Sequence, residues 1–439
     1  MSRTPLSVLL ACLVIAEGGA RARPTSGPTL AGLDALYPEL ETLYVDLHRS
    51  PELSLREVET AAKMAERLRA LGFDVTTGVG GTGVVGVLRN GKGPAVMLRT
   101  DLDALPIEEK TGLAYASKVT VVDAGGATVP VMHACGHDLH MTVWVGTATL
   151  LSKARSRWRG TLIMVGQPAE EKGAGARMML ADGLFERFPK PDYALAIHND
   201  AGMPAGKVGW VAGHAFANVD TVDVVIYGKG GHGAYPQNAI DPVVIAARTV
   251  VALQTIVARE NNPLDPAVIT VGSIHGGTKH NIIPEEVKLE LTVRSYKEDV
   301  RARLLAAIAR VVKAEAAAAA APKEPLVEHH QGESIGALYN DPALTKRLVE
   351  ALGRGLGAAR LEERPPVMGG EDFGEYGRAG VPLTMFWVGA VDPKTYADAK
   401  AANRALPSNH SALFAPAPAP TIKTGIETLT LAALELFGK

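Results

Sequence analysis

The sequence predicts an α/β fold with a mostly parallel-sheet domain and an inserted ferredoxin-like βαββαβ unit. Short apolar runs alternate with helical stretches in the outer parts of the chain, which is typical of parallel strands joined by helices. A middle segment instead has the order strand, helix, strand, strand, helix, strand. The chain has 439 residues, which is more than one hydrophobic core usually fills. We therefore expect two domains.

The first 22 residues are predicted to be a signal peptide. Arg3 supplies a positive start, residues 6–16 are an apolar run too short to span a bilayer, and residues 20–22 form a small-x-small cleavage site. Residues 23–32 are expected to be a disordered lead-in. The protein would then be secreted or periplasmic, without a membrane attachment after cleavage. The alternative is a disordered, mildly apolar leader.

Composition and cysteine usage narrow the possible functions. Hydrophobic residues make up 47% of the chain and charged residues 21%, as in a globular protein. The formal net charge of −2 argues against nucleic-acid binding, because phosphate contacts need a basic excess. Of two cysteines, Cys12 leaves with the signal peptide, so Cys135 has no disulfide partner in the mature chain.

The larger, parallel-sheet domain is predicted to begin at residue 33, and its first part extends to residue 218. Helical spacing predicts helices at 33–47 and 61–71, the second ending at Gly72. His48 lies in the turn between them and is expected to be packed or at the surface.

Four buried strands follow, and each ends where a polar or turn residue appears. These runs and the residues after them are 94–98 with Asp101 and Asp103, 161–165 with Glu170 and Glu171, 193–197 with His198, and 382–388 with Gly389. Sites in open α/β sheets form beyond the carboxyl ends of the strands, so we expect these groups to share one crevice.

Residues 219–328 form the predicted inserted unit. Its elements are a strand at 221–227, a helix at 241–258, strands at 267–275 and 285–293, a helix at 297–320 and a strand at 325–328. Asp241 and Pro242 are a typical start for the first of these helices. The α/β pattern then resumes over residues 329–439, the second part of the larger domain, which closes with a helix at 421–437.

Cys135, Gly136 and His137 form a candidate metal-binding triplet. Glycine lets the backbone bend so that the thiolate and the imidazole face one point. Zinc binds both donors well, whereas a thiolate is a poor ligand for magnesium or calcium. The alternative for an isolated Cys-x-His triplet is a packed cysteine beside the start of a helix.

Seven motifs together resemble one family, the M20 metallopeptidases, in their order along the chain. They are HACGHD (133–138), QPAEE (167–171), IHN (197–199), GGHGAYP (230–236), NIIP (281–284), GGEDF (369–373) and NHS (409–411). The resemblance is to the amidohydrolase branch, which includes hippurate hydrolases, N-acyl-amino-acid amidohydrolases and plant auxin-conjugate hydrolases. It extends from about Leu43 to the C-terminus.

The resemblance implies a centre of two divalent metal ions, zinc first, with manganese, cobalt or nickel as alternatives. It implies Glu170 as the general base, and its metal ligands would be Cys135, His137, Glu171, His198 and His410. Two ions about 3.5–4 Å apart can share a water, lower its pKa and polarise a carbonyl.

Asp101 departs from the pattern of the wider family, where a histidine ligand stands two residues before the aspartate. Asp103 keeps the expected catalytic role of orienting a metal-bound histidine. The same departure occurs in the amidohydrolase branch, where the Cys-Gly-His motif supplies the donors, and this favours that branch over dipeptidases.

The resemblance makes the mostly parallel-sheet domain the catalytic domain and the inserted unit a lid and dimerisation domain. It also assigns roles to three residues of the inserted unit. His232 would donate to the developing oxyanion, in dimeric relatives from the partner subunit, while Asn281 and Arg294 would bind a substrate carboxylate. Glu371 and Asp372 are expected to shape the pocket.

The implied function is metal-dependent hydrolysis of the amide bond of a small-molecule N-acyl amino acid or amino-acid conjugate, in a homodimer formed through the lid. One alternative is an M20 dipeptidase or carboxypeptidase. The other is a metal-holding binding protein without catalytic activity.

Overall fold

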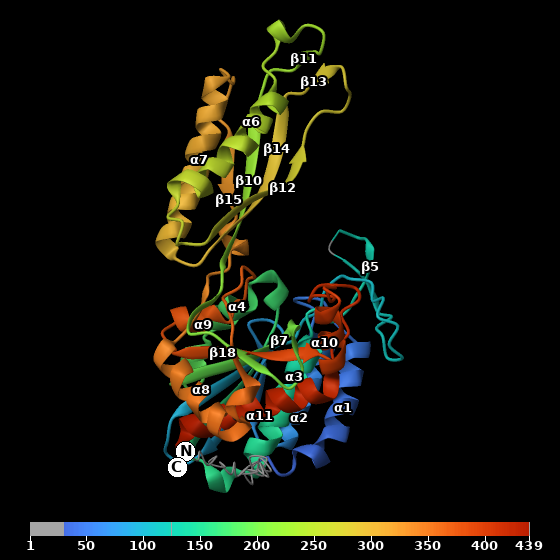
Figure 1. Cartoon of the computed structure of the whole chain (residues 1–439), viewed down its shortest axis with the longest axis vertical. Coiled ribbons are helices and arrows are strands. Elements are labelled where there is room, and N and C mark those ends of the chain that lie inside the picture. The colour runs from blue at the N-terminus through green and yellow to red at the C-terminus, as the bar shows by residue number, and fades with distance from the viewer. Residues whose placement is uncertain (1–29, 124, 439) are drawn as a thin grey trace, which may run out of the picture.

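The computed structural model describes residues 30–123 and 125–438. The predicted signal peptide (1–22) and most of the predicted lead-in (23–32) lie outside the described residues. Figure 1 shows two bodies, a sheet body that contains both ends of the described chain and an elongated unit above it.

An eight-stranded sheet organises the sheet body, in the order β1-β2-β6-β3-β7-β18-β8-β17. Its strands are β1 (Asp74–Val79), β2 (Gly83–Asn90), β3 (Ala95–Asp101), β6 (Gly160–Gln167), β7 (Tyr193–Pro204), β8 (Val208–Trp210), β17 (Leu361–Glu363) and β18 (Leu383–Val391). The four central strands β6, β3, β7 and β18 pair in parallel. They correspond to the four predicted apolar runs, so the mostly parallel α/β sheet is confirmed.

Helices cover both faces of this sheet, as the burial of its central strands requires. On one face lie α1 (Leu33–Arg49), α2 (Val58–Ala70), α3 (His137–Lys153), α8 (Pro342–Leu356) and α11 (Pro418–Phe437). On the other lie α4 (Gly175–Ala181), α5 (Leu184–Arg187) and α9 (Gly374–Arg378). Helices α3 and α11 can approach closely because Gly146 has no side chain. A Cβ at this position would lie 2.3 Å from Cδ1 of Ile426.

The elongated unit, called the lid below, has the six elements in the predicted order. They are β10 (Asn218–Tyr227), α6 (Pro242–Thr255), β12 (Ala267–His275), β14 (Glu286–Ser295), α7 (Glu298–Ala318) and β15 (Leu326–His329). Burial alternates along β10 and β14, so one face of the sheet packs on α6 and α7. The Asp241 side chain accepts a hydrogen bond from the Val243 amide and caps α6, as predicted.

Short elements complete the chain. They are the hairpin of β4 (Thr120–Val122) and β5 (Thr128–Pro130), the pair of β9 (Gly213–Phe216) and β16 (Leu338–Asn340) at the base of the lid, the pair of β11 (Gly231–His232) and β13 (Ile282–Ile283), and α10 (Pro393–Ala401). Strands β11 and β13 form the tip of the lid, at the end that is far from the sheet body (Figure 1).

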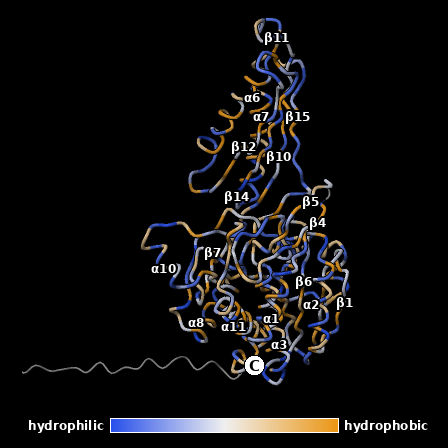
Figure 2. Tube along the Cα trace, turned by 90° about the vertical axis from the view of Figure 1, so that its right-hand side faces the viewer, coloured by the Kyte–Doolittle hydropathy of each residue, from blue (hydrophilic) through white to orange (hydrophobic). Residues whose placement is uncertain are grey.

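The outer side of α6 remains apolar and exposed. Figure 2 shows the apolar residues along this helix, and Val244 and Val251 are 55% and 70% exposed. Residues 242–260 are long and apolar enough to cross a membrane by length and composition alone. Their inner side is part of the lid core through Ile245, Leu253 and Ile256.

Candidate metal centre

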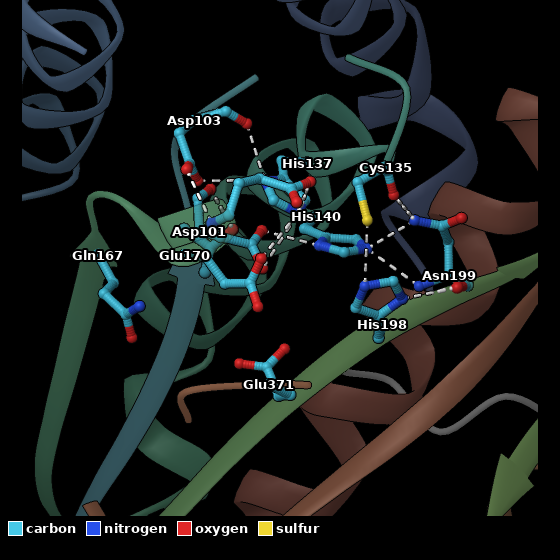
Figure 3. Close-up of polar contacts among 12 residues, drawn as sticks. Asp101, Asp103, Cys135, His137, His140, Gln167, Glu170, His198, Asn199 and Glu371 are labelled. Carbon is cyan, nitrogen blue, oxygen red and sulfur yellow. Dashed lines mark hydrogen bonds and ion pairs between the residues drawn. The ribbon is translucent and has the colours of Figure 1, made fainter. Parts of the chain in front are cut away.

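The central strands and the segments next to them bring several of the predicted site residues together (Figure 3). Strand β3 ends at Asp101, β6 ends three residues before Glu170, and His198 lies in β7. Cys135 lies in the loop that leads into α3, and His137 is the first residue of that helix.

Gly136 shapes the loop that carries the two central donors. Its φ of 82° lies in the left-handed region, which glycine adopts without the penalty of a side chain. A Cβ at this position would lie 2.4 Å from Nδ2 of Asn199, so the loop also needs the space that glycine leaves. Its neighbours are thereby brought near β7, where Sγ of Cys135 lies 3.5 Å from Nε2 of His198.

Hydrogen bonds fix the orientation of two imidazole rings. Nδ1 of His137 lies 2.7 Å from the backbone carbonyl of Asp103, and Nδ1 of His198 lies 2.7 Å from the carbonyl of Asn199. A carbonyl can only accept, so each Nδ1 donates and, when the ring is neutral, Nε2 keeps a lone pair that can bind a metal. Nε2 of His137 is buried and forms no hydrogen bond with the described part of the chain.

The five predicted ligands form two groups that share Cys135. Cys135, His137 and His198 offer donor atoms within 4.8 Å of one another, and so do Cys135, Glu171 and His410. Oε1 of Glu171 lies 3.4 Å from Nε2 of His410, and it is buried without a hydrogen bond in the described structure. Thiolate, imidazole and carboxylate donors with buried lone pairs fit divalent transition-metal ions.

Burial and neighbouring charges shift the proton affinities of these groups. Burial alone would raise the pKa of the Cys135 thiol, but the nearby His198 and His137 lower it well below its ordinary value. Burial, followed by repulsion from the Cys135 thiolate, raises the pKa of Glu171 to about 7. The two histidines therefore favour the thiolate of Cys135, the form that binds metal.

Glu170, the predicted base, lies beside the ligands. Its Oε2 is 3.8 Å from Nε2 of His137. Burial, followed by repulsion from Glu371 and Glu171, raises the pKa of Glu170 well above its ordinary value. A carboxylate with a raised pKa in a cleft is typical of a group that exchanges protons during catalysis.

Asp103 contacts both halves of the site. Its backbone carbonyl accepts from His137, and its Oδ2 accepts from the hydroxyl of Ser54 at 2.7 Å and from the backbone amide of Glu171 at 3.0 Å. It therefore fixes the position of two predicted ligands at once.

Arg99 and His140 are parts of the site that the sequence did not reveal. The guanidinium of Arg99 is buried and donates to Asp101 at 2.7 Å, Gln167 at 3.0 Å, Glu371 at 2.9 Å and Asp372 at 3.0 Å. The one available signal was a charged residue at the end of an apolar run.

His140, His137 and Asp101 have possible ligand atoms close to one another, but His140 is not available as a metal ligand. Its Nε2 accepts from the backbone amide of Asn199 at 2.9 Å, so the proton is on Nδ1, which donates to Asp101 at 2.8 Å. Burial is the main reason that the pKa of His140 falls to about 4, so the ring is neutral.

A cavity of about 540 Å³ opens over these groups. Glu170, Glu171 and the ligands except His137 line it, together with Phe216, Trp387 and Arg294. Arg294 is half-buried at the base of the lid and donates to the Thr292 hydroxyl at 2.9 Å and the Met368 carbonyl at 3.3 Å. It forms no ion pair with any residue in the described ranges.

His232 and Asn281 do not reach this cavity within one chain. Both are exposed at the tip of the lid, where the Gly233 amide donates to the Asn281 carbonyl at 2.9 Å. Strand β14 separates this tip from Arg294, and eight residues of extended chain span roughly 27 Å. The predicted pairing of Asn281 with Arg294 on one carboxylate is therefore not present within this chain.

The α/β domain places thiolate, imidazole and carboxylate donors together, beside a further carboxylate. This arrangement defines a metal-dependent hydrolase. The chain belongs to peptidase family M20/M25/M40, whose family model matches residues 97–407.

Three relatives illustrate the range of this family. The N-acetyl-L-cysteine deacetylase of Bacillus subtilis (strain 168) is 39% identical over 347 residues, which are 78% of this chain and 79% of that protein. Thermostable carboxypeptidase 1 of Saccharolobus solfataricus is 36% identical over 352 residues, 79% of this chain and 85% of that protein. The crystal structure of a Bacillus subtilis dinuclear metal binding peptidase of the M20 family has a TM-score of 0.73 at 29% identity, and covers 92% of this chain and 99% of that chain.

Proposed function

We propose that this protein binds two divalent metal ions and hydrolyses the amide bond of N-acyl amino acids. The convergence of two donor groups on the shared Cys135 thiolate, beside Glu170, is the observation that carries this proposal. The similarity to an N-acetyl-L-cysteine deacetylase supports the substrate class.

One ion would be held by Cys135, His137 and His198, and the other by Cys135, Glu171 and His410. When bound, such ions polarise the scissile carbonyl and lower the pKa of a water that they share. Zinc is our first assignment because thiolate and imidazole donors dominate the set, and manganese, cobalt and nickel are the alternatives.

Glu170 accepts a proton from the attacking water and passes it to the leaving nitrogen. The hydroxyl of the water joins the carbonyl carbon, the carbon–nitrogen bond breaks, and the amine leaves with the transferred proton. Asp103 supports this step as a positioning residue, because it holds the ring of His137 and the backbone of Glu171.

Arg294 binds the carboxylate of the amino-acid part of the substrate. It lines the cavity and has no carboxylate partner in the described chain, and its guanidinium can bind a carboxylate through two hydrogen bonds. The buried rings of Phe216 and Trp387 form an apolar wall that suits the acyl group.

We further propose a homodimer that forms through the lid. The exposed apolar side of α6 and the outer edge of β12, where Ile274 is 52% exposed, are surfaces that a second copy of this chain would cover. Because the lid tip is far from its own cavity, His232 of the partner subunit would complete this site as an oxyanion donor. Sedimentation of the wild type and of Val251→Asp tests the dimer, which the charge should weaken.

We also propose that residues 1–22 are removed during export and that the mature protein is periplasmic or secreted. The positive start, the short apolar run and the small-x-small site support this. N-terminal sequencing of the mature protein, with cell fractionation, tests it.

The decisive experiment compares Glu170→Gln with the wild type, both loaded with a defined metal. We expect near-normal metal content in the variant and turnover of hippurate-type substrates lowered by about 10²–10⁴, the usual contribution of a general base. Near-native turnover would remove Glu170 from this role.

A carboxypeptidase is the second candidate, supported by the 36% identical thermostable carboxypeptidase. Release of C-terminal residues from peptides faster than cleavage of N-acyl amino acids would favour it. A metal-loaded protein that cleaves neither class would instead be a binding protein.

A further inference from the structure

A second cavity adjoins the catalytic cavity. It has a volume of about 450 Å³ and lies between α10 and the loop that leads to His410. Asp200 and Asn409 line both cavities and form the wall between them. A ligand group in the second cavity would therefore lie next to the metal ligands.

Two positively charged side chains line this second cavity. Lys400 and Arg404 are exposed, and neither side chain forms an ion pair or hydrogen bond with any residue that the structure describes. Lys394 of the same helix, which is not among the lining residues, instead pairs with Asp398 at 2.5 Å.

The carboxylate that borders the cavity is already engaged. Oδ1 of Asp200 accepts from the Gly202 amide at 2.7 Å, and Oδ2 lies 3.3 Å from the guanidinium of Arg364. The positive charges of Lys400 and Arg404 are therefore not neutralised by the protein, and the cavity favours an anion.

The wall is anchored to the metal centre. Nδ2 of Asn409 donates to the backbone carbonyl of Cys135 at 3.0 Å and to Oδ1 of Asn199 at 3.0 Å. These bonds fix the second cavity relative to the donors of the metal ions. Arg294 borders the first cavity and not the second, so a carboxylate at Arg294 and an anion at Lys400 and Arg404 occupy separate places.

We propose that the second cavity is a substrate subsite for a second carboxylate. This inference rests on the proposed function and names its substrate class: N-acyl amino acids with a further carboxylate, either on the acyl group or on the amino-acid side chain. The two cations bind the carboxylate, and the Tyr396 ring and the Leu406 side chain contact the chain that carries it.

The test compares each acid with the amide in which only the further carboxylate is replaced. This amide has nearly the same shape as the acid. One pair is N-acetylglutamate and N-acetylglutamine, and the other is N-succinylalanine and its terminal amide. Exposed charge pairs contribute about a two- to fivefold effect each, so we expect kcat/KM to favour the acid by about tenfold in at least one pair. The difference should lie in KM and shrink with added salt.

The double variant Lys400→Ala/Arg404→Ala should bring the acid-to-amide ratio close to one, while Lys394→Ala, the matched control, should keep the wild-type ratio. The pair that responds identifies the part of the substrate that enters the subsite. A wild type that cleaves both amides without favouring either acid, or a double variant that keeps the preference, would overturn the subsite alone. Failure to cleave all four compounds would overturn the proposed function with it.

Discussion

Replacing Arg99 with methionine should destabilise the sheet body by about 3–5 kcal/mol, the usual cost of breaking a buried ion pair. The guanidinium is buried, and it donates to three carboxylates, those of Asp101, Glu371 and Asp372. Methionine has a similar length and fills the space, so the loss reports the charge and not a cavity.

The magnitude follows from what the removed group leaves behind. Hydrogen bonds to charged groups contribute about 1.5–3 kcal/mol each, so a simple sum over the three carboxylates would exceed 4 kcal/mol. The variant no longer has to bury a guanidinium, which returns part of that sum. Asp372, whose pKa burial raises to about 7, can also take up a proton and limit the cost of its unpaired charge.

Urea unfolding of the metal-free protein, followed by tryptophan fluorescence, measures this cost in the right domain. All four tryptophans lie outside the lid, at positions 144, 158, 210 and 387. The matched control is Arg67→Met, because Arg67 on α2 of the sheet body forms a surface pair with Glu39 at 2.7 Å and should contribute less than about 1 kcal/mol. Equal losses of stability in the two variants would refute the reasoning.

Three further predictions test the metal loop and its supports. Cys135→Ala should lower the metal content of the purified protein, because it removes the donor that both groups share; an unchanged metal-to-protein ratio would contradict this. Gly136→Ala should lower both the thermal midpoint and the metal content, since its φ of 82° is unfavourable for alanine and the new Cβ would lie 2.4 Å from Asn199. Burial alone would lower the pKa of His48, but hydrogen bonds, first to Asp138, raise it to about 10. Protonated His48 therefore stabilises the fold fully below its ordinary pKa of 6.5 and loses this effect as the pH rises through about 10. His48→Gln should then cost more stability near pH 6 than near pH 10, measured by unfolding at both values; a cost that does not change with pH would argue against a charged ring.

Local patterns in the sequence predicted most of the elements that carry the site. Strand β12 spans Ala267–His275, which are the bounds predicted for it, because turn residues mark both of its ends. The polar residues after the central apolar runs were also identifiable locally, because each of them follows directly on the end of a short apolar run. His48 was expected in the turn after the first helix, but it lies in the last turn of α1 and is buried.

Helix α3 and the Arg99 network were not predictable in this way. Helix α3 is buried on all sides over most of its length, so it lacks the apolar stripe by which a surface helix is recognised. Arg99 and Glu371 are 272 residues apart in the chain. Their contact depends on which strands become neighbours in the sheet, and no local pattern encodes that.

The contacts of Asp101 explain why the departure at this position is compatible with a metal centre. The residue stands where the wider family has a histidine ligand, yet both of its oxygens are occupied. Oδ1 accepts from His140 at 2.8 Å and Oδ2 from Arg99 at 2.7 Å. Burial alone would raise the pKa of this carboxyl, but interactions with neighbouring side chains, first His137 and then His140 and Arg99, lower it well below its usual range. Asp101 therefore supports the protein side of the site, and the thiolate of Cys135 is the anionic donor that faces both groups of ligands.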